Sequence, residues 1–420
     1  MDIPQFKDII KKVGVLKNYS SLVVPVVIGL VGVLLFIPTG FVNSGLGRQI
    51  TKESVSMGKS VTSLSRSVVA RDQWRVEQDY QQAYERDANE TLLLAERSTR
   101  RELLSYRIFP EPKDTSTLIF DEFGRQYRKA IRELITRINA RDCPTETELQ
   151  RHLQSSSSSY VGRRGSLGKL SQVDAAIADV LCRAKAESAF VYANPAVLAG
   201  YEFWEGYEYP GMQTAVEDCW YWQLAYWVIE DVIDTIDALN SGSSSVFTSP
   251  VKRLLGASFI VGGERRGSKQ AKQGIYTTMP NYVLYPEDGL TESCTERFSD
   301  VDIDVVHFNV VVVVNSKSVL SFMQQLCSAK EHKFAGFFDE AGEPETFKHN
   351  QITILESNIS PVDREDSDHE LYRYGEDAVV ELDLICEYIL NNKGYDEIKP
   401  PAIKELLEEV EEEEEEEEDY

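Results

Sequence analysis

The chain has 420 residues, of which 42% are hydrophobic, and it carries a formal net charge of -25 at pH 7. This length predicts two or three structural units with a substantial core. Because nucleic-acid binding depends on basic contacts to phosphates, so acidic a chain is not expected to bind nucleic acid. Much of the charge lies in residues 393–420, predicted to be a disordered, solvated tail; a tail that docks on a basic partner is the alternative.

An uncharged stretch at residues 21–42 is the first element along the chain. As a helix it reaches about 33 Å, enough to cross the hydrocarbon core of a bilayer. It is longer than the apolar part of a signal peptide, and no small-residue cleavage site follows. We therefore predict one uncleaved transmembrane helix, with the lipid bilayer as its partner. The lysines ahead of it place residues 1–20 in the cytoplasm and the bulk of the chain outside; they are Lys7, Lys11, Lys12 and Lys17.

Residues 43–109 are predicted to form a long coiled-coil helix. The stretch from 45 to about 107 contains no proline, and its apolar residues recur by sevens, fours and threes, as the a and d positions of a coiled coil do. The predicted interface residues are Ile50, Met57, Val61, Leu64 and Val68. A less regular continuation comprises Trp74, Val76, Tyr80, Tyr84 and the leucines at 92–94. Since one helix alone would leave this pattern in water, we expect a second copy or a homologous chain to cover it.

Residues 110–214 are predicted to be a helical region with a serine-rich linker. Pro110 and Pro112 end the long helix. An amphipathic helix follows and ends near Cys143; its apolar residues are Phe120, Phe123, Tyr127, Ile131, Leu134 and Ile138. After the linker, residues 171–189 form a further predicted helix. Within the linker, GRRGSLGKL lacks the spacing and the hydroxyl of a phosphate-binding loop, so no nucleotide cofactor is expected.

Residues 215–392 carry the clearest pattern, in the order α-β-β-α-β-β. The predicted helices are 219–239 and 317–329, and the predicted strands are 251–261, 305–314, 352–359 and 380–388. The predicted core residues are Leu224, Val228, Val319, Phe322, Leu326, Leu382 and Leu384. Acidic residues from Glu230 to Asp237 are placed on the wet side of the first helix. Two α-β-β units can form a four-stranded antiparallel sheet with both helices on one face and water on the other, which is a circularly permuted ferredoxin-like arrangement of the α+β class.

Cysteine and histidine spacing predicts neither a metal site nor a catalytic site. The six cysteines include no C-x-x-C pair, and the five histidines are scattered without an H-E-x-x-H motif. The first candidates for a disulfide are Cys143 and Cys182. The expected state of Cys327 and Cys386 is a buried free thiol, and His307 is interpreted as a packing or edge residue of a strand.

The whole layout resembles the inner-membrane assembly proteins PilN and PilO of type IV pili and their type II secretion relatives GspL and GspM. The resemblance rests on FNVVVVVNSKSVLSFMQQL, ITILESNI and AVVELDLICEYIL, which look like the strand, helix and paired strands of the PilO-type domain. Residues 110–214 and the glutamate tail depart from that pattern.

The resemblance implies a non-enzymatic scaffold in a bacterial inner membrane, with its bulk in the periplasm. Its partners would be a second copy or a PilN/PilO-like chain, and other inner-membrane components of the pilus or secretion system. Two other function classes stay open. One is a membrane-anchored periplasmic sensor, for which a cytoplasmic partner would have to supply the output. The other is a membrane-anchored enzyme.

Overall fold

The computed structural model describes residues 52, 54–63, 71–156, 172–260, 279–292, 294–338 and 342–407, together with positions 25, 28, 29 and 31. The chain forms two compact units, Met1–Asp87 and Ala88–Tyr420. Most of the predicted transmembrane stretch lies outside the described residues, as do Ile50, Leu64, Val68 and the glutamates from 408 onward. In the part of the chain that is described, no helix is both long and apolar enough to cross a bilayer.

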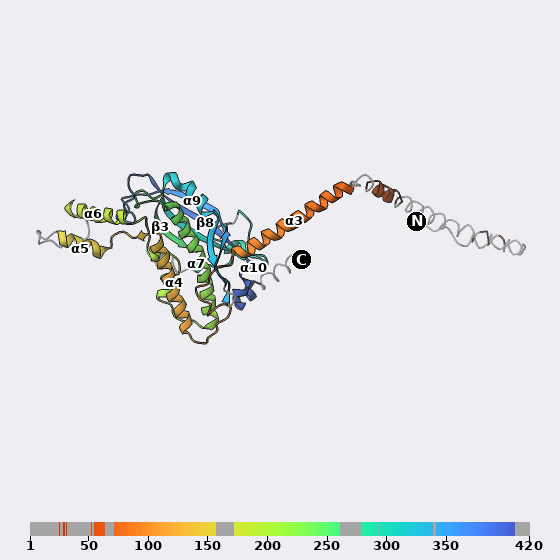
Figure 1. Ribbon diagram of the computed structural model, residues 1–420, viewed down its shortest axis with the longest axis horizontal. Helices are drawn as coiled ribbons and strands as arrows, with labels where there is room; N and C mark the ends of the chain where they lie inside the picture. Colours follow the sequence, from red (N-terminus) through yellow and green to blue (C-terminus); the bar gives the residue numbers. More distant parts are fainter. Residues whose placement is uncertain are drawn as a thin grey trace, which may run out of the picture. The chain divides into compact units, whose positions relative to one another are not determined.

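Helix α3, Arg71–Ser98, is the described part of the predicted long helix (Figure 1), and residues 54–63 are helical as well. The helix ends at Ser98, so the predicted end near residue 107 is wrong. The Thr99 hydroxyl donates to the carbonyl oxygen of Glu96 or of Asn391, at 3.1 and 3.0 Å. A Cβ atom on Gly394 would lie 1.8 Å from this hydroxyl oxygen, so only glycine permits the approach. The helix therefore stops where its end docks on the last strand.

A six-stranded mixed sheet forms the centre of the second unit, in the order β1-β2-β3-β4-β8-β7. Its strands are β1 Ala140–Arg141, β2 Val191–Tyr192, β3 Val251–Ser258, β4 Ile303–Asn315, β7 Ile352–Pro361 and β8 Val379–Asn391. The four long strands are antiparallel to one another, whereas β2 runs parallel to β3 and β1 runs parallel to β2. The class is therefore α+β, as predicted.

The long elements follow one another as α7, β3, β4, α9, β7 and β8, which is the predicted alternation. Helix α7 is Met212–Asn240, and α9, Val319–Leu326, is shorter than expected. Sequence analysis missed a hairpin between α9 and β7, made of β5, Lys330–Phe334, and β6, Glu345–His349. Both strands of the hairpin are rich in charged and polar residues, so they lack the apolar alternation that predicts a strand.

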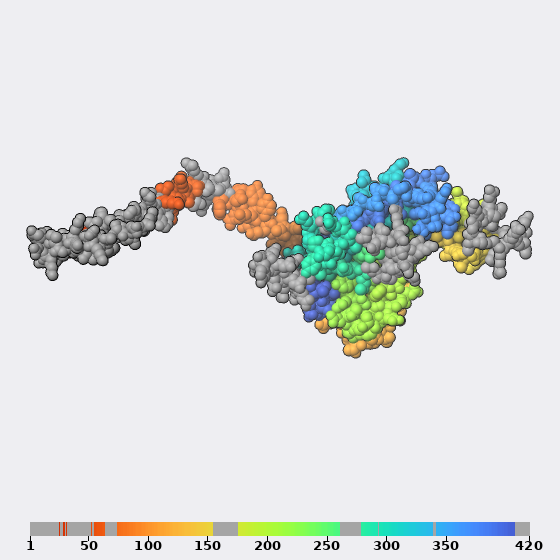
Figure 2. Space-filling view, turned by 180° about the vertical axis from the view of Figure 1, so that it is seen from behind, coloured from red at the N-terminus to blue at the C-terminus, as the bar shows by residue number. Residues whose placement is uncertain are grey.

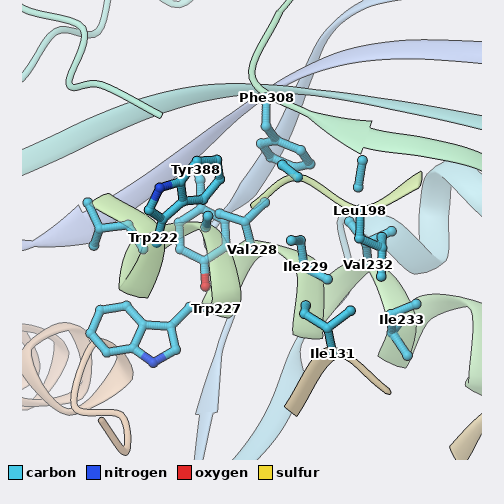
Figure 3. Packing of buried hydrophobic residues seen from close by; sticks show 14 of the residues in the cluster. Ile131, Leu198, Trp222, Trp227, Val228, Ile229, Val232, Ile233, Phe308 and Tyr388 are labelled. Atoms are coloured by element: carbon cyan, nitrogen blue, oxygen red, sulfur yellow. The ribbon is translucent and has the colours of Figure 1, made fainter. Parts of the chain in front are cut away.

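The core lies between the sheet and α7, and it continues on the far side of α7. Figure 3 shows Val228 and Val232 of α7 below Phe308 of β4, with Ile131 of α4 on the other side. Helix α4 is Leu118–Arg137. Because α7 is apolar around most of its circumference, it needs covering on two sides. The seven residues assigned to the core from the sequence are all buried, namely Leu224, Val228, Val319, Phe322, Leu326, Leu382 and Leu384.

The predicted boundaries at 214 and 392 do not separate structural units. Phe109, Phe120 and Trp204 lie in the same core cluster as α7, and so do Tyr395 and Ile398 beyond β8. In the space-filling view, α7 and the stretch that leads into it, in lime green, lie directly against α4, in orange (Figure 2). Residues 110–214 are thus part of the domain, and the predicted tail contributes core residues up to Ile403.

The remaining short elements lie between α4 and α7 and after β8. They are α5 Glu146–Ser156, α6 Gln172–Ser188 and α10 Asn392–Tyr395, with residues 401–407 also helical. Helices α5 and α6 lie side by side (Figure 1), joined by Lys185 and Glu148 at 3.0 Å.

The predicted disulfide is wrong, because Cys143 and Cys182 are both free thiols. Of the two cysteines expected to be buried thiols, Cys386 is buried and Cys327 half-buried.

The second face of the sheet is covered, so the prediction that it faces water is wrong. Val313 and Val379 pack there with Tyr192 and Tyr374 in a second apolar cluster. Farther along the same sheet, Glu387 is fully buried and accepts hydrogen bonds from Thr295 and Arg297. The charge of Glu387 is therefore met by polar partners from the segment before β4.

His307 lies on this covered face, in β4 opposite Glu387. It is buried, and its Nδ1 accepts a hydrogen bond from the Leu290 backbone N–H at 3.1 Å. A Cβ on Gly289 would lie 2.9 Å from the imidazole ring. The ring is thus packed closely beneath the segment before β4, which agrees with its interpretation as a packing residue.

Replacing Phe322 by alanine is expected to destabilise the second unit by about 3–5 kcal/mol, since the ring is fully buried in the core. Leu320, on the same helix and 78% exposed, provides the control: Leu320→Ala should change the free energy of unfolding by less than about 0.5 kcal/mol. Urea unfolding followed by circular dichroism measures both. Equal midpoints for the two variants would contradict this packing of α9.

Candidate functional site

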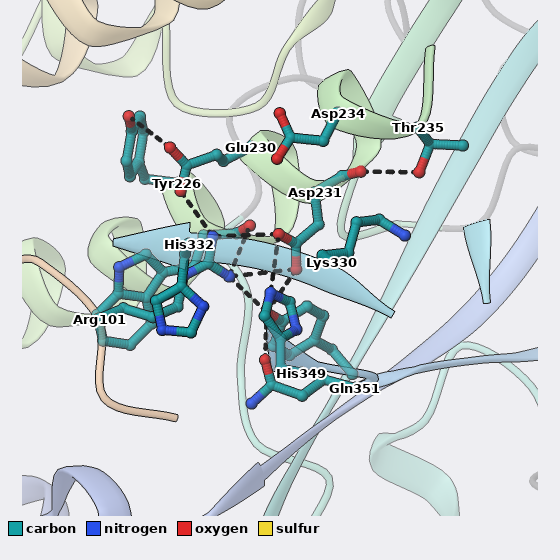
Figure 4. Close-up of polar contacts among 12 residues, drawn as sticks. Arg101, Tyr226, Glu230, Asp231, Asp234, Thr235, Lys330, His332, His349 and Gln351 are labelled. Carbon is teal, nitrogen blue, oxygen red and sulfur yellow. Dashed lines mark hydrogen bonds and ion pairs between the residues drawn. The ribbon is translucent and has the colours of Figure 1, made fainter. Parts of the chain in front are cut away.

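Arg101 forms a buried polar cluster where the chain leaves α3. Its Nη1 and Nη2 each donate to Asp231 at 3.1 Å, and Nη2 also donates to Glu230 at 2.6 Å. Nη1 lies 2.7 Å from the hydroxyl of Tyr388, which in turn donates to Asp231 at 2.7 Å. Figure 4 shows Arg101, from the segment after α3, beside Glu230 and Asp231 of α7. We call this group the Arg101 cluster.

The sequence analysis put Asp231 on the wet side of its helix, and this was wrong. The residue is 1% exposed, because the hairpin and the segment after α3 cover that side of α7. Burial opposes ionisation, but the nearby charge of Arg101 outweighs it and holds the pKa of Asp231 well below its usual range. Burial also opposes the charge on Arg101, yet Asp231, Tyr388 and Glu230 together raise its pKa. The pair is therefore ionised while buried.

The β5–β6 hairpin closes over the Arg101 cluster with two histidines. His349 Nε2 lies 3.4 Å from an Asp231 carboxylate oxygen, and the two imidazole centroids are 5.2 Å apart. His332 Nε2 lies 2.8 Å from the backbone oxygen of Arg100. Burial, together with the charge of Arg101, lowers the pKa of His332 to about 4, so the ring is neutral near pH 7.

Lys330 fixes the base of the same hairpin. Its ammonium donates to the carbonyl oxygens of Gln325, Leu326 and Ser328, at 2.8 to 3.2 Å. These are the last carbonyls of α9 and its first turn beyond, where a cation is favourable. The open end of the hairpin, where Lys330 pairs with His349, is thereby held both to α9 and to the Arg101 cluster.

A second buried cluster holds the chain after β8. Lys399 Nζ lies 2.7 Å from an Asp304 oxygen, and Tyr395 donates to the same carboxylate. The Tyr395 ring is stacked on Trp220, with centroids 5.7 Å apart and planes at 3°. These contacts explain why residues 395–399 belong to the domain. Sequence analysis missed them because the charged stretch was assigned to the tail.

The two buried clusters join elements of the fold through pairs of opposite charges and hydrogen bonds. In the Arg101 cluster, opposite charges neutralise one another beneath the surface, across three elements far apart in the sequence. Over the described residues, no group of three histidine, cysteine, aspartate or glutamate side chains is arranged to hold a metal ion.

One exposed feature of the described residues is an apolar stripe on α3. It consists of Val76, Tyr80, Tyr84 and Leu94, which are 51%, 60%, 74% and 65% exposed. At 3.6 residues per turn they fall within about 80° of arc. Met57 and Val61, the two predicted interface residues that are described, are exposed in the same way. Exposed apolar side chains that share one side of a helix suit an interaction surface.

Comparisons with known proteins give no family. No protein-family model matches the chain, and no curated protein matches it. Two solved structures from Akkermansia muciniphila show a distant likeness. One is a crystal structure, 8% identical, which covers 69% of this chain and 84% of that chain at a TM-score of 0.25. The other is a protein without its transmembrane region, 9% identical, covering 70% and 95% at a TM-score of 0.25. We base no conclusion on likenesses at this level.

Replacing Arg101 by methionine is expected to destabilise the second unit by about 3–5 kcal/mol, because it leaves Asp231 charged, buried and without its main partner. The matched control is Arg100→Met, at an exposed neighbour whose side chain is outside the cluster. Chemical unfolding at pH 7 measures both variants. A loss no larger than that of the control would contradict the structural importance of the cluster.

The stability of the second unit should fall as the pH drops from about 6.5 to about 4. His332 is held neutral when folded, with a pKa of about 4, but takes up a proton near pH 6.5 when unfolded. Acid therefore favours the unfolded chain, by about 1–3 kcal/mol over this range. His332→Gln should flatten this part of the profile, whereas Lys333→Gln, on the exposed side of β5, should not. Parallel profiles for His332→Gln and wild type would contradict the assignment.

Proposed function

We propose that the protein is a non-enzymatic scaffold component of a bacterial inner membrane, in an assembly of the type IV pilus or type II secretion kind. In this proposal residues 21–42 anchor the chain in the bilayer, and the bulk lies in the periplasm. The helical residues 54–63 and α3 form an arm that pairs with another helix. The single observation that carries the proposal is the apolar stripe, which is left in water on α3.

Helix pairing follows from the physical cost of that exposure. Each Å² of apolar surface removed from water contributes about 25 cal/mol. Isolated helices gain little stability from hydrogen bonds alone and depend on packing of an apolar face. A partner helix that covers Val76, Tyr80 and Tyr84 would therefore stabilise both the complex and the arm itself. This is the kind of contact that a coiled coil provides.

The Arg101 cluster fixes the segment that follows α3 to other elements of the second unit. Arg101 comes three residues after the end of α3, and it is fixed to α7 and β8 by charge-assisted hydrogen bonds. Thr99 is fixed to the end of β8 as well. The segment that follows α3 thus has a defined path within the second unit.

Pairing between domains is the second contact that we propose. The antiparallel order β3-β4-β8-β7 is the one expected for a circularly permuted ferredoxin-like domain, which supports the likeness to the PilO-type domain. Among the described strands, β7 pairs only with β8, so its other edge is open. Ile359 on this strand is 54% exposed. An open edge with an exposed apolar residue is suited to contact with a second domain.

Replacing both Tyr80 and Tyr84 by glutamate should reduce crosslinking of the full chain to its partners in membranes by about tenfold, because charges would then lie in the apolar stripe. Gln82→Glu, on the opposite side of the same helix, is the control and should leave crosslinking unchanged. Amine- or photo-crosslinking followed by electrophoresis provides the measurement. Undiminished crosslinking in the double variant would refute pairing through the stripe.

A further inference from the structure

The outer edge of β7 is covered along its first half. The Ile389 backbone N–H donates to the carbonyl oxygen of Gln351 at 2.9 Å, which fixes the phase of the ladder between β8 and β7. By the alternation of an antiparallel pair, Ile354 then points its own N–H and C=O away from β8. The Ile354 backbone is hydrogen-bonded to Cys327, which directly follows α9. The end of α9 therefore covers this part of the edge.

The second half of the edge is open. A bulge between Ile354 and Glu356 shifts the alternation by one residue, so Ser357 and Ile359 become the residues that point their backbone groups outward. Pro361 agrees with this phase, because a proline in an edge strand places its missing N–H on the free side. Within the described parts of the chain, nothing hydrogen-bonds to the outward groups of Ser357 and Ile359. Two N–H and two C=O groups are thus available for pairing.

This short open stretch matches itself. A second copy, rotated by 180° about an axis through Asn358 and perpendicular to the sheet, places its Ser357 opposite Ile359 and its Ile359 opposite Ser357. Every outward group of these residues then has a partner in the other copy. Sliding the copies by two residues would bring either Pro361 or Leu355, which has no partner in the ladder, opposite an open residue. The register centred on Asn358 is therefore the one that satisfies all of these groups.

Charge and apolar contact favour the same register. Glu356 is the only charged residue of the stretch 355–361, and it would lie opposite the uncharged Ser360 of the second copy. Ile359 is 54% exposed although it lies opposite the core residue Leu382, on the core face of the sheet. The two Ile359 side chains would meet diagonally across the axis. Pairing would thus cover an apolar side chain without placing like charges opposite one another.

We infer that two copies of this chain join edge to edge through β7, antiparallel and with Asn358 on the two-fold axis, so that their sheets become continuous. This inference rests on the proposed function, because it names the second domain for the open edge of β7. A contact between identical surfaces closes after two copies. The bulge and Pro361 confine the pairing to a short stretch, which keeps the edge from recruiting longer strands.

A disulfide at position 358 tests the two-fold register. Asn358 would face its counterpart in a non-hydrogen-bonded pair, with Cα atoms about 4.5 Å apart, a distance that a disulfide can span. Glu356 would lie about 14 Å from its counterpart, because four residues separate the two along the strands. The full chain is used in membranes, with the exposed Cys294 replaced by serine in every variant.

Mild oxidation with copper phenanthroline should link Asn358→Cys into dimers at least about tenfold more efficiently than Glu356→Cys, the matched control on the same strand. Electrophoresis without reductant measures the yield. Equal yields would indicate random collision, and equal yields or the absence of an Asn358→Cys dimer would overturn the inference.

A charge beside the axis provides a second test. Ile359→Lys, added to the Asn358→Cys chain, would bring two ammonium groups together and should lower the dimer yield about tenfold. Val301→Lys is the control, since Val301 is 68% exposed and precedes β4, beyond the end of β7, and it should leave the yield unchanged. The urea midpoint of each variant separates lost pairing from lost folding. An undiminished yield with Ile359→Lys would overturn the inference.

The outcomes distinguish this inference from the proposed function. If Asn358→Cys gives no dimer while Tyr80→Glu with Tyr84→Glu still reduces crosslinking to partners, the inference fails and the proposed function stands. If the dimer forms and those two glutamates leave crosslinking to partners unchanged, the inference stands and helix pairing fails. Capture of a different chain by Asn358→Cys, without a second copy, would also overturn the inference.

Discussion

The ion pair between Arg101 and Asp231 is the constraint on which the arrangement of the second unit depends. A charge taken out of water is tolerated only when an opposite charge and hydrogen-bond donors reach it. Asp231 lies inside on α7, so the segment after α3 must come to it, β8 must present Tyr388, and the β5–β6 hairpin must close the remaining side. Four parts of the chain are thereby held in one relation. Such a pair fixes the relative position of these four parts more reliably than it adds to the net stability of the fold.

Helix α7 explains why residues 99–214 cannot be separated from the sheet. A helix that is apolar around most of its circumference must be covered on more than one side, and one sheet covers only one of them. Helix α4 and the aromatic residues around Trp204 supply the other cover. The same reasoning applies to β4, whose consecutive valines are buried on both faces of the sheet. Elements that are buried on more than one side therefore need segments from distant parts of the chain to complete one core.

Sequence analysis succeeded where the signal was local. The valines of β4 and the spacing around Phe322 gave the alternation of helices and strands, because periodicity is set by neighbouring residues. It failed where the outcome depended on partners far along the chain. From its own helix Asp231 is predicted to be a solvated charge. Its pairing with Arg101, 130 residues earlier, is what makes it an interior residue. The hairpin strands and residues 395–399 were missed for the same reason, since polar residues become interior ones only through long-range pairing.

Charge pairing inside the second unit follows one rule: carboxylates that leave water are met by cations of the same chain, Asp231 by Arg101 and Asp304 by Lys399. In each pair the two residues lie far apart in the sequence. A carboxylate taken out of water without its cation would be strongly unfavourable, so each pair also requires the two segments to come together. Neutralising the buried charge and placing the chain are therefore achieved by the same contact.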